Sequence, residues 1–357
     1  MTERLYYADS LLTHFDAVVT DIQEFSRTSG QSIWRIALDR TAFYPTSGGQ
    51  PFDTGCLIAT ARSGAELVAA IHDVEEDEAG QVWHHTAKPL QAGTSVRGEI
   101  DWQRRLDHMQ QHSGQHVLSA ACMENCGAAT VSFHLGEEIC TIDLAVEQLA
   151  AETLLAIEER ANQILAEDRP VTIETVTQAQ AASWLANGKL RKLPTRDGDI
   201  RVIRIADFDC NACGGTHVRS TGQIGGLHLR GTEKVRHSVR VEFVCGLRAA
   251  RTARRDFETL TAAGRALSAG AAEIPEAITH LQAQNKHAIK ERATLLDRLA
   301  RYQAAELLRE SDDDSGRSSN PRYIRRTLSP PDAPDAAFVK LLASKITVSS
   351  SKAIALL

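Results

Sequence analysis

The sequence predicts an α+β protein with a small N-terminal β-barrel, a mixed domain and a helical, coiled-coil-like C-terminal region. Short alternating runs separated by glycine and polar turns fill residues 1–97 and predict the barrel. Helical and strand patterns alternate over residues 98–250, which is typical of a sheet packed against helices. Residues 251–311 are rich in Ala, Leu, Glu, Arg and Gln and predict helices. A linker at residues 312–335 and a partial C-terminal domain at residues 336–357 complete the predicted order.

The barrel is predicted from three runs with partial alternation of apolar and polar residues, namely Ala17–Ile22, Ser32–Leu38 and Gln81–Thr86. Several short strands in such a short stretch of chain are typical of a small barrel. The acidic run Asp73–Glu78 is interpreted as a solvated hairpin tip rather than as a site. Val96–Trp102 then leads from the barrel into the mixed domain.

The mixed domain is predicted from a helix and several strands. Glu147–Glu167 has the apolar spacing of an amphipathic helix. Ile200–Phe208 is predicted as a strand, with Ile203 and Ile205 on one face and Val202, Arg204 and Ala206 on the other. The other expected strands are the pair Thr130–Leu135 and Cys140–Leu144, followed by Val171–Val176.

The C-terminal region has an apolar repeat of seven residues. Its main positions are Leu281, Ala288, Leu295 and Tyr302, with Ile278, Asn285 and Leu299 at the partner positions. This pattern is typical of a coiled coil or helical hairpin, although Arg292 falls on the seam, and it predicts a homodimer through the C-terminal helices. Ala353–Leu357 is predicted as a buried strand with no later neighbour, which indicates a truncated or degenerate C-terminal domain.

Two short runs carry most of the chemical information. His112-Ser113-Gly114-Gln115-His116 places two imidazoles on one face of a helix, without the adjacent glutamate of a metalloprotease helix. Cys213-Gly214-Gly215-Thr216-His217 adds a thiol and an imidazole in a loop, because its glycines disfavour a helix. Three imidazoles and one thiolate suit tetrahedral zinc. Together the runs predict one zinc ion per chain, with ligands His112, His116, Cys213 and His217.

Each run also has an ordinary structural interpretation. The first could be a buried histidine pair with satisfied hydrogen bonds, and the second a glycine turn. Their presence in one chain as complementary halves of a site favours the metal. Cys210 forms a Cys-x-x-Cys pattern with Cys213 and competes as a ligand. His108 shares the helix face of His112 and is interpreted as a packing histidine, or one that supports the ligands, in preference to a catalytic group.

Composition favours a cytoplasmic protein. The sequence contains no apolar run of the ~20 residues that a membrane span needs, and its N-terminus lacks the layout of a signal peptide. Seven cysteines without framework spacing indicate reduced thiols. The net charge of −6 is not the signature of a nucleic-acid binder, but basic residues gather on both sides of the second run. They are expected either to follow a nucleic-acid backbone or to form a solvated charged face: Lys189, Arg191, Lys192, Arg230, Lys234, Arg236, Arg240, Arg248, Arg251, Arg254 and Arg255.

The two runs and two further segments resemble a known family. His108–His116, Cys213–Gly225 and the upstream segment Phe43–Gly55 are similar to motifs of the alanyl-tRNA editing proteins, the free-standing relatives of the editing domain of alanyl-tRNA synthetase. The likeness continues through Arg240–Ala249 and covers residues 5–250 in the same order. The same core resembles the editing domain of threonyl-tRNA synthetase.

The resemblance implies a trans-editing hydrolase that cleaves the ester joining a wrong amino acid, usually serine or glycine, to the 3′ end of alanine tRNA. It implies that residues 98–250 form a zinc-binding editing domain. It also implies the ATP binding that is ascribed to the family. Ser113, Gln115 and Thr216 are expected to be catalytic residues that orient water or substrate, with Gln50 near the same pocket. Two positions depart from the family pattern: Ser113 stands where many members have threonine, and Thr46-Ser47 stands where relatives often have an acidic residue or a third glycine.

The sequence leaves the role of zinc open. Four protein ligands complete the coordination of a structural zinc, whereas a catalytic zinc keeps a position for water or substrate. Zinc could acidify the attacking water, or it could hold the substrate amino group or the loop while an unligated water attacks. Two other functions compete: a non-catalytic, zinc-stabilised tRNA-binding module, and editing of serine-charged threonine tRNA. The segment Gly48-Gly49-Gln50 favours the alanyl group.

Overall fold

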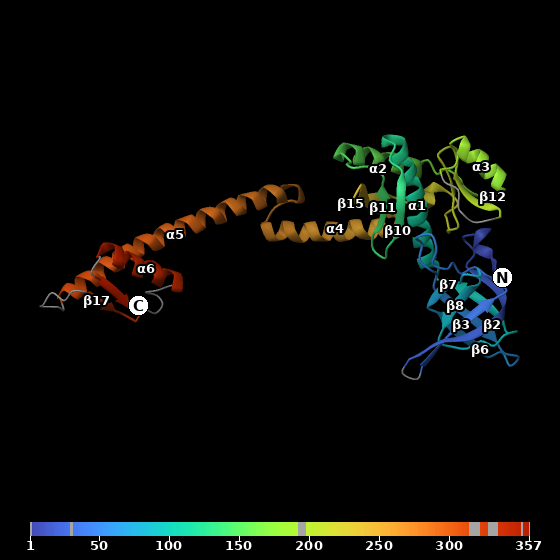
Figure 1. Ribbon diagram of the computed structural model, residues 1–357, viewed down its shortest axis with the longest axis horizontal. Coiled ribbons are helices and arrows are strands. Elements are labelled where there is room, and N and C mark those ends of the chain that lie inside the picture. Colours follow the sequence, from blue (N-terminus) through green and yellow to red (C-terminus); the bar gives the residue numbers. More distant parts are fainter. Residues whose placement is uncertain are drawn as a thin grey trace. The chain divides into compact units, whose positions relative to one another are not determined.

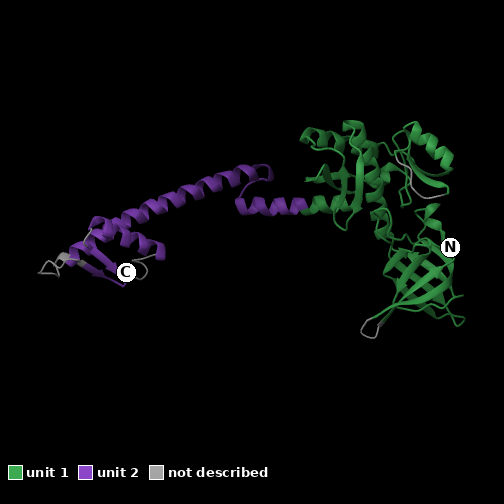
Figure 2. Cartoon of the chain, viewed as in Figure 1, with its two compact units in different colours: residues 1–255 green, residues 256–357 purple. Residues whose placement is uncertain are grey.

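The structure is a computed structural model that describes residues 2–28, 31–191, 198–313, 322–327, 335–350 and 353–356. The chain forms two compact units, residues 1–255 and residues 256–357, which Figure 2 shows in green and purple. Both short runs lie in the first unit. Among the described residues, no helix is both long and apolar enough to cross a membrane.

A seven-stranded antiparallel sheet forms the N-terminal part of the first unit (Figure 1). In chain order its strands are β2 (His14–Thr28), β3 (Gln31–Leu38), β5 (Gly55–Thr60), β6 (Glu66–Ile71), β7 (Asp73–Glu76), β8 (Val82–Thr86) and β9 (Ser95–Ile100). Their order in the sheet is β6-β5-β9-β2-β3-β8-β7. Alternation along β2 buries Phe15, Ala17 and Val19 on the core face. Two short strands, β1 (Glu3–Arg4) and β4 (Arg40–Thr41), pair separately.

The two end strands of this sheet belong to one segment of the chain. β6 and β7 are separated only by His72, whose amide donates to the carbonyl of His85 at 3.0 Å. β6 pairs with β5 while β7 pairs with β8, so the sheet curves back towards its own beginning. The three predicted runs lie in β2, β3 and β8. The sheet is therefore observed where strands were predicted, and the closed barrel stays a prediction.

The acidic run Asp73–Glu78 forms a hairpin tip only in its last two residues, so the prediction is wrong in part. Its first four residues form β7, because the alternating pattern places Val74 in the core with none of its surface exposed. The turn contains Asp77 and Glu78, and the amide of Gly80 donates to the carbonyl of Asp77 across it at 2.9 Å. A run of carboxylates predicts a loop, but in β7 the buried apolar residue Val74 between them decides the structure.

Helix α1 (Trp102–Cys126) carries the first run. Its N-terminus is capped by the Asp101 carboxylate, which accepts from two backbone amides, and it ends at Gly127 with a φ of 64°. α1 shares a core with α2 (Ala151–Ala166) and with a four-stranded antiparallel sheet. The strands of that sheet, in the order β10-β11-β16-β15, are Thr130–Leu135, Cys140–Leu144, Ser238–Cys245 and Leu227–Val235.

The α2 helix is shorter than predicted, while the strand pair before it is confirmed. β10 and β11 pair in antiparallel fashion over the expected residues. α2 begins at Ala151 rather than at Glu147, because Ala150 still has an extended backbone with φ −72° and ψ 151°. Glu147 instead forms an ion pair with Lys234 at 3.0 Å.

A three-stranded sheet carries the second run. It consists of β12 (Val171–Val176), β13 (Ile200–Ile205) and β14 (Asp209–Ala212), with α3 (Gln178–Ala186) between the first two strands. The predicted strand Ile200–Phe208 is too long, because the chain turns after Ile205 and returns as β14. The two faces of β13 are as expected: Ile203 and Ile205 enter the core of α1, whereas Val202 enters a second, smaller core.

The C-terminal region is helical, as predicted, through α4 (Gly246–Leu267) and α5 (Ile274–Asp313). Pro275 lies in the first turn of α5, where proline is tolerated. At the repeat positions, Leu281, Leu295 and Tyr302 are 54%, 55% and 72% exposed. The coiled coil and the homodimer therefore stay predictions.

The second unit also contains a small core around the end of α5. Helix α6 (Ala336–Ser349) and the parallel strands β17 (Arg322–Arg325) and β18 (Ala353–Leu356) form it with α5. The predicted linker, residues 312–335, is thus wrong in part, since β17 lies within it; residues 314–321 and 328–334 of this stretch lie outside the described residues. β18 has its neighbour in β17, which precedes it in the chain.

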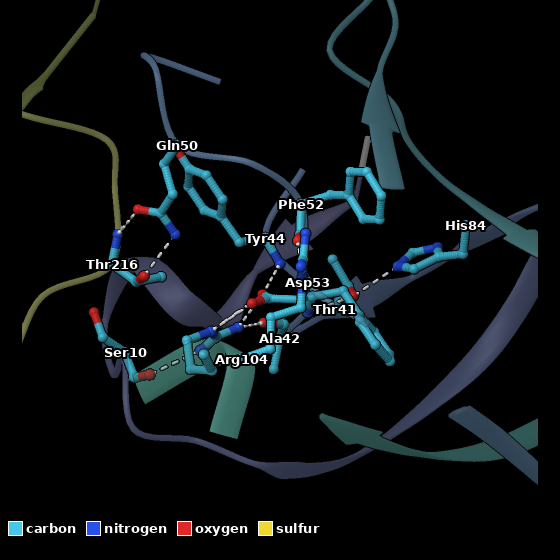
Figure 3. A network of polar contacts seen from close by, with 12 residues as sticks. Ser10, Thr41, Ala42, Tyr44, Gln50, Phe52, Asp53, His84, Arg104 and Thr216 are labelled. Carbon is cyan, nitrogen blue, oxygen red and sulfur yellow. Dashed lines mark hydrogen bonds and ion pairs between the residues drawn. The ribbon is translucent and has the colours of Figure 1, made fainter. Parts of the chain in front are cut away.

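A buried ion pair joins the N-terminal sheet to α1. Arg105 of α1 and Asp53 have no exposed surface, and Arg105 Nε lies 3.0 Å from Asp53 Oδ1. The same guanidinium donates to the carbonyl of Ser10 at 2.7 Å and to that of Ala42. Figure 3 shows Asp53 at the centre of this network, with Ser10 and Ala42 around it. The segment that contains Asp53 is thereby held against α1.

His84 makes the stability of the N-terminal sheet depend on pH. It is fully buried, with Nδ1 3.0 Å from the Ile36 carbonyl oxygen and Nε2 2.8 Å from Thr41 Oγ1 (Figure 3). Burial lowers the pKa of His84 from 6.5 to about 4. Between these values only the unfolded chain binds the proton, so stability falls as pH falls through this window, by about 3 kcal/mol in all.

We therefore expect His84→Gln to flatten the pH dependence of stability, since glutamine keeps an N–H donor but does not titrate. Between pH 6.5 and pH 4, the free energy of unfolding of the variant should decrease less steeply with falling pH. The difference in slope should correspond to about one bound proton. Urea unfolding followed by circular dichroism at a series of pH values measures this slope. Identical slopes for the variant and the unchanged protein would contradict the prediction.

Candidate metal centre

The structure brings the four predicted metal ligands together. His112 and His116 lie on α1, and Cys213 and His217 lie in the loop after β14. One potential ligand atom from each of these side chains lies within 4.8 Å of the others. The histidines are 3%, 5% and 2% exposed in chain order, so the cluster is largely shielded from solvent.

The spacing of the donor atoms fits one tetrahedral ion. Cys213 Sγ lies 3.4 Å from His112 Nε2 and 3.3 Å from His217 Nε2. Zinc bonds of about 2.3 Å to sulfur and about 2.0–2.1 Å to nitrogen place the two donors about 3.5 Å apart at the tetrahedral angle. Three imidazoles and a thiolate are also donors that zinc favours. The residues therefore fit a zinc ion.

Each imidazole has an oxygen beside its Nδ1 atom. The distances are 2.8 Å from His112 to Gln50 Oε1, 3.0 Å from His217 to Ser113 Oγ, and 3.4 Å from His116 to Asp209 Oδ2. Histidines that bind a metal are commonly held in this way through the ring nitrogen that the metal does not use. This leaves Nε2 of each ring available to an ion.

The electrostatics of the cluster favour an ionised sulfur. Burial opposes ionisation of Cys213, but the imidazoles of His112, His217 and His116 together hold the pKa of the thiol well below its ordinary value of 9.0. Burial also acts to lower the pKa of His116, yet Asp209 and Cys213 raise it to about 9. The thiolate is the form of cysteine that binds metals.

Glycines let the two runs approach each other. A Cβ atom at Gly215 would lie 2.2 Å from His112 Cε1, far inside van der Waals contact. A Cβ atom at Gly114 would lie 2.2 Å from the sulfur of Cys245, at the end of β16. Gly215 therefore allows the loop to reach the helix, and Gly114 allows the helix to pack on the sheet.

Comparison with known proteins shows the family of the chain. Residues 200–241 match the family model described as threonyl and alanyl tRNA synthetase second additional domain, and residues 1–104 match that of the class II (A) tRNA synthetases. Alanyl-tRNA editing protein AlaX-M of Methanosarcina acetivorans is 33% identical over 240 residues, which are 64% of this chain and 92% of that protein. The chain belongs to the alanyl-tRNA editing protein family.

Two further relatives show how far the likeness extends. AlaX-M of Methanosarcina mazei is 34% identical over 245 residues, which cover 64% of this chain and 90% of that editing protein. Alanine–tRNA ligase of Pyrococcus abyssi is 34% identical over 315 residues, or 86% of this chain. The chain spans only 32% of the length of that ligase.

In this chain, two of the expected catalytic residues contact the predicted ligands or the residues beside them. Ser113 is 1% exposed, with its Oγ beside His217 and accepting from the amide of Val218 at 3.2 Å. Thr216 is fully buried and accepts from Gln50 Nε2 at 2.8 Å. Gln115 instead donates to Ser119 Oγ at 2.8 Å. Contact between these residues and a substrate stays a prediction.

Gln50 joins the N-terminal sheet to both runs. Its Oε1 lies beside His112 Nδ1 and accepts from the amide of Thr216 at 3.2 Å, while its Nε2 donates to the Thr216 hydroxyl. Figure 3 shows the Gln50 amide directed at Thr216. The sequence placed Gln50 near the pocket, but only the fold assigns it the role of bridging two runs that are far apart in the chain.

Three further residues lie near the predicted ligands in the sequence, namely Cys210, His108 and Asp209. Cys210 packs in the smaller core of the three-stranded sheet and does not belong to the four-residue ligand cluster. His108 is buried outside that cluster, and burial lowers its pKa to about 4, in agreement with a packing role. Asp209 beside His116 was missed; its only signal in the sequence is a carboxylate four residues before Cys213.

Several of the basic residues around the second run form ion pairs with carboxylates of the same chain. Arg248 is only 7% exposed and pairs with Asp107, so it cannot lie on a surface for tRNA, contrary to expectation. Lys192 lies outside the described residues. Other ion pairs in this set are Arg240 with Asp143, Lys234 with Glu147, Arg191 with Asp209, and Arg255 with Glu138. A tRNA-binding surface stays a prediction.

We expect Gly215→Ala to disrupt metal binding, because the added methyl group collides with the His112 ring. Gly214→Ala is the matched control, since its Cβ would lie 3.6 Å from the nearest atom, the Tyr7 hydroxyl. The zinc content and the cobalt(II) affinity of the two purified variants measure the difference. Equal metal binding by both would show that close approach at Gly215 is not required.

Ser113→Ala tests whether this hydroxyl supports a ligand. Loss of the oxygen beside His217 should weaken metal binding by about tenfold or more. Ser113→Thr keeps the hydroxyl and should stay near the unchanged protein. Metal affinity is measured by competition with a chelating dye. If Ser113→Ala changes only the KM for a substrate and leaves metal affinity intact, the residue contacts substrate instead.

Proposed function

We propose that this protein is a trans-editing aminoacyl-tRNA deacylase that hydrolyses the ester of serine, and of glycine, wrongly attached to alanine tRNA. The observation that carries the proposal is the cluster of His112, His116, Cys213 and His217 in a member of the alanyl-tRNA editing protein family. The match to the second additional domain of threonyl and alanyl tRNA synthetases covers part of this site.

One zinc ion per chain is the proposed cofactor. It would be held by His112, His116 and His217 through Nε2 and by Cys213 through Sγ, and when bound it would supply a fixed positive charge beside the reacting ester. Gln50, Ser113 and Asp209 orient the three imidazoles from the outside. Because the ligands come from two distant runs, the same ion would also hold the loop on α1.

Specificity follows from the chemistry of the amino acids that must be separated. A pocket shaped for alanine rejects serine poorly, whereas a site that hydrogen-bonds a hydroxyl separates the two strongly. The hydroxyl groups of Ser113 and Thr216 and the amide of Gln115 are the proposed groups for orienting substrate or water around the cluster. Cytoplasmic location, ATP binding and a homodimer through the C-terminal helices stay predictions.

A deacylation assay tests the proposed activity. We expect release of serine from serine-charged alanine tRNA and of glycine from glycine-charged alanine tRNA, with much slower release from serine-charged threonine tRNA. His116→Ala and Cys213→Ala should each lose both bound zinc and deacylation, because each removes one of the four donors.

The outcomes separate the competing functions. Faster release from threonine tRNA would replace the proposed substrate by the threonyl one. If the protein binds tRNA and unfolds without metal but releases no amino acid, it is a zinc-stabilised binding module. Full activity in either ligand variant would remove the cluster from the mechanism.

A further inference from the structure

Arg201 of β13 is a buried cation without a carboxylate partner among the described residues. Its side chain is 7% exposed, and no ion pair is found for it in that part of the chain. Its Nη2 atom is buried and makes no hydrogen bond to the described residues. An unpaired charge in a protein interior is costly, so the surroundings of Arg201 must compensate it in another way.

The contacts of Arg201 converge on the loop of the second run. Nη1 donates to the carbonyl of Cys213 at 2.7 Å and to that of Gly215 at 2.9 Å. The backbone carbonyl of Arg201 accepts from the amide of Cys213 at 3.1 Å. Arg201 therefore holds Cys213 from two directions and spans the turn that contains both glycines.

The same guanidinium also reaches the N-terminal segment. Nε donates to the carbonyl of Tyr7 at 3.0 Å, and the centre of the guanidinium lies 5.4 Å from the Tyr7 ring. One planar guanidinium thus donates to three carbonyl groups that come from two distant parts of the chain. Arginine is suited to this role because its planar fork offers several donors in fixed directions.

Two other buried arginines of the first unit provide a comparison. Arg105 pairs with Asp53 and Arg248 pairs with Asp107, so each has an opposite charge in direct contact. Arg201 has no such partner among the described residues, and its hydrogen bonds end on the backbone carbonyl groups of Tyr7, Cys213 and Gly215. These carbonyl groups compensate the buried charge, so the burial of Arg201 depends on the position of the loop.

We propose that Arg201 is a positioning residue of the candidate metal centre, which clamps the turn from Cys213 to Gly215 onto the N-terminal segment. The inference rests on the proposed zinc site but not on the proposed deacylation. Its role is to hold the sulfur at the distance from the imidazoles at which four donors close on one ion.

The test is the binding of cobalt(II), which replaces zinc and reports ligand geometry through its visible spectrum. We would compare Arg201→Met and Arg201→Lys with Arg248→Met, a control that removes an equally buried arginine whose hydrogen bonds go to Asp107, Gly136 and Cys140 instead of the loop. Arg201→Met should bind cobalt at least about tenfold more weakly and show a weaker sulfur-to-cobalt absorption band. Arg201→Lys should recover part of both, since it keeps the charge but not the fork.

Circular dichroism and thermal unfolding show whether each variant is folded. Arg248→Met should lose stability, but its cobalt affinity should stay within about twofold of that of the unchanged protein. Loss of a group that supports a metal ligand weakens metal binding by about tenfold or more, so a twofold change indicates no such role. A folded Arg201→Met variant with unchanged affinity and spectrum would overturn the proposal, as would equal losses in Arg248→Met. If Arg201→Met does not fold, the same readouts on Arg201→Lys decide. If the cobalt results are as expected but the protein does not deacylate tRNA, the proposed function is refuted and the role of Arg201 is not.

Discussion

The buried ion pair between Arg105 and Asp53 is the contact on which the geometry of the site depends. Neither residue has exposed surface, and the guanidinium also binds two carbonyl groups of the N-terminal part of the chain. Leaving one member of such a pair without its partner costs about 3–5 kcal/mol, so the segment around Asp53 stays against α1. Gln50, three residues earlier, is thereby kept between His112 and Thr216.

The candidate metal centre is thus assembled from three parts of the chain rather than two. Helix α1 supplies two imidazoles, the loop after β14 supplies a thiol and an imidazole, and the N-terminal segment supplies the Gln50 support. Each part is held by buried polar groups, and such groups are stable only when their partners are in place. This explains why an N-terminal sheet that provides no ligand is nevertheless part of the site.

The likeness to alanine–tRNA ligase reaches beyond this assembly. It covers 86% of the chain, more than the 255 residues of the first unit, and therefore extends into the second. The relatives named AlaX-M match only 64% of the chain while covering most of their own length. About a third of this chain is thus left unmatched by these relatives.

The sequence by itself determined which four side chains would cluster, the α1 helix that carries His112 and His116, and most strands, because these depend on local spacing and alternation. It misplaced β7 and the turn before β14, where single apolar positions or a reversal of the chain decide the structure. Only the tertiary structure decided that Gln50, Ser113 and Asp209 support the imidazoles, and that Arg201 holds the loop. These contacts join residues from different elements, and the spacing of residues within one element carries no information about them.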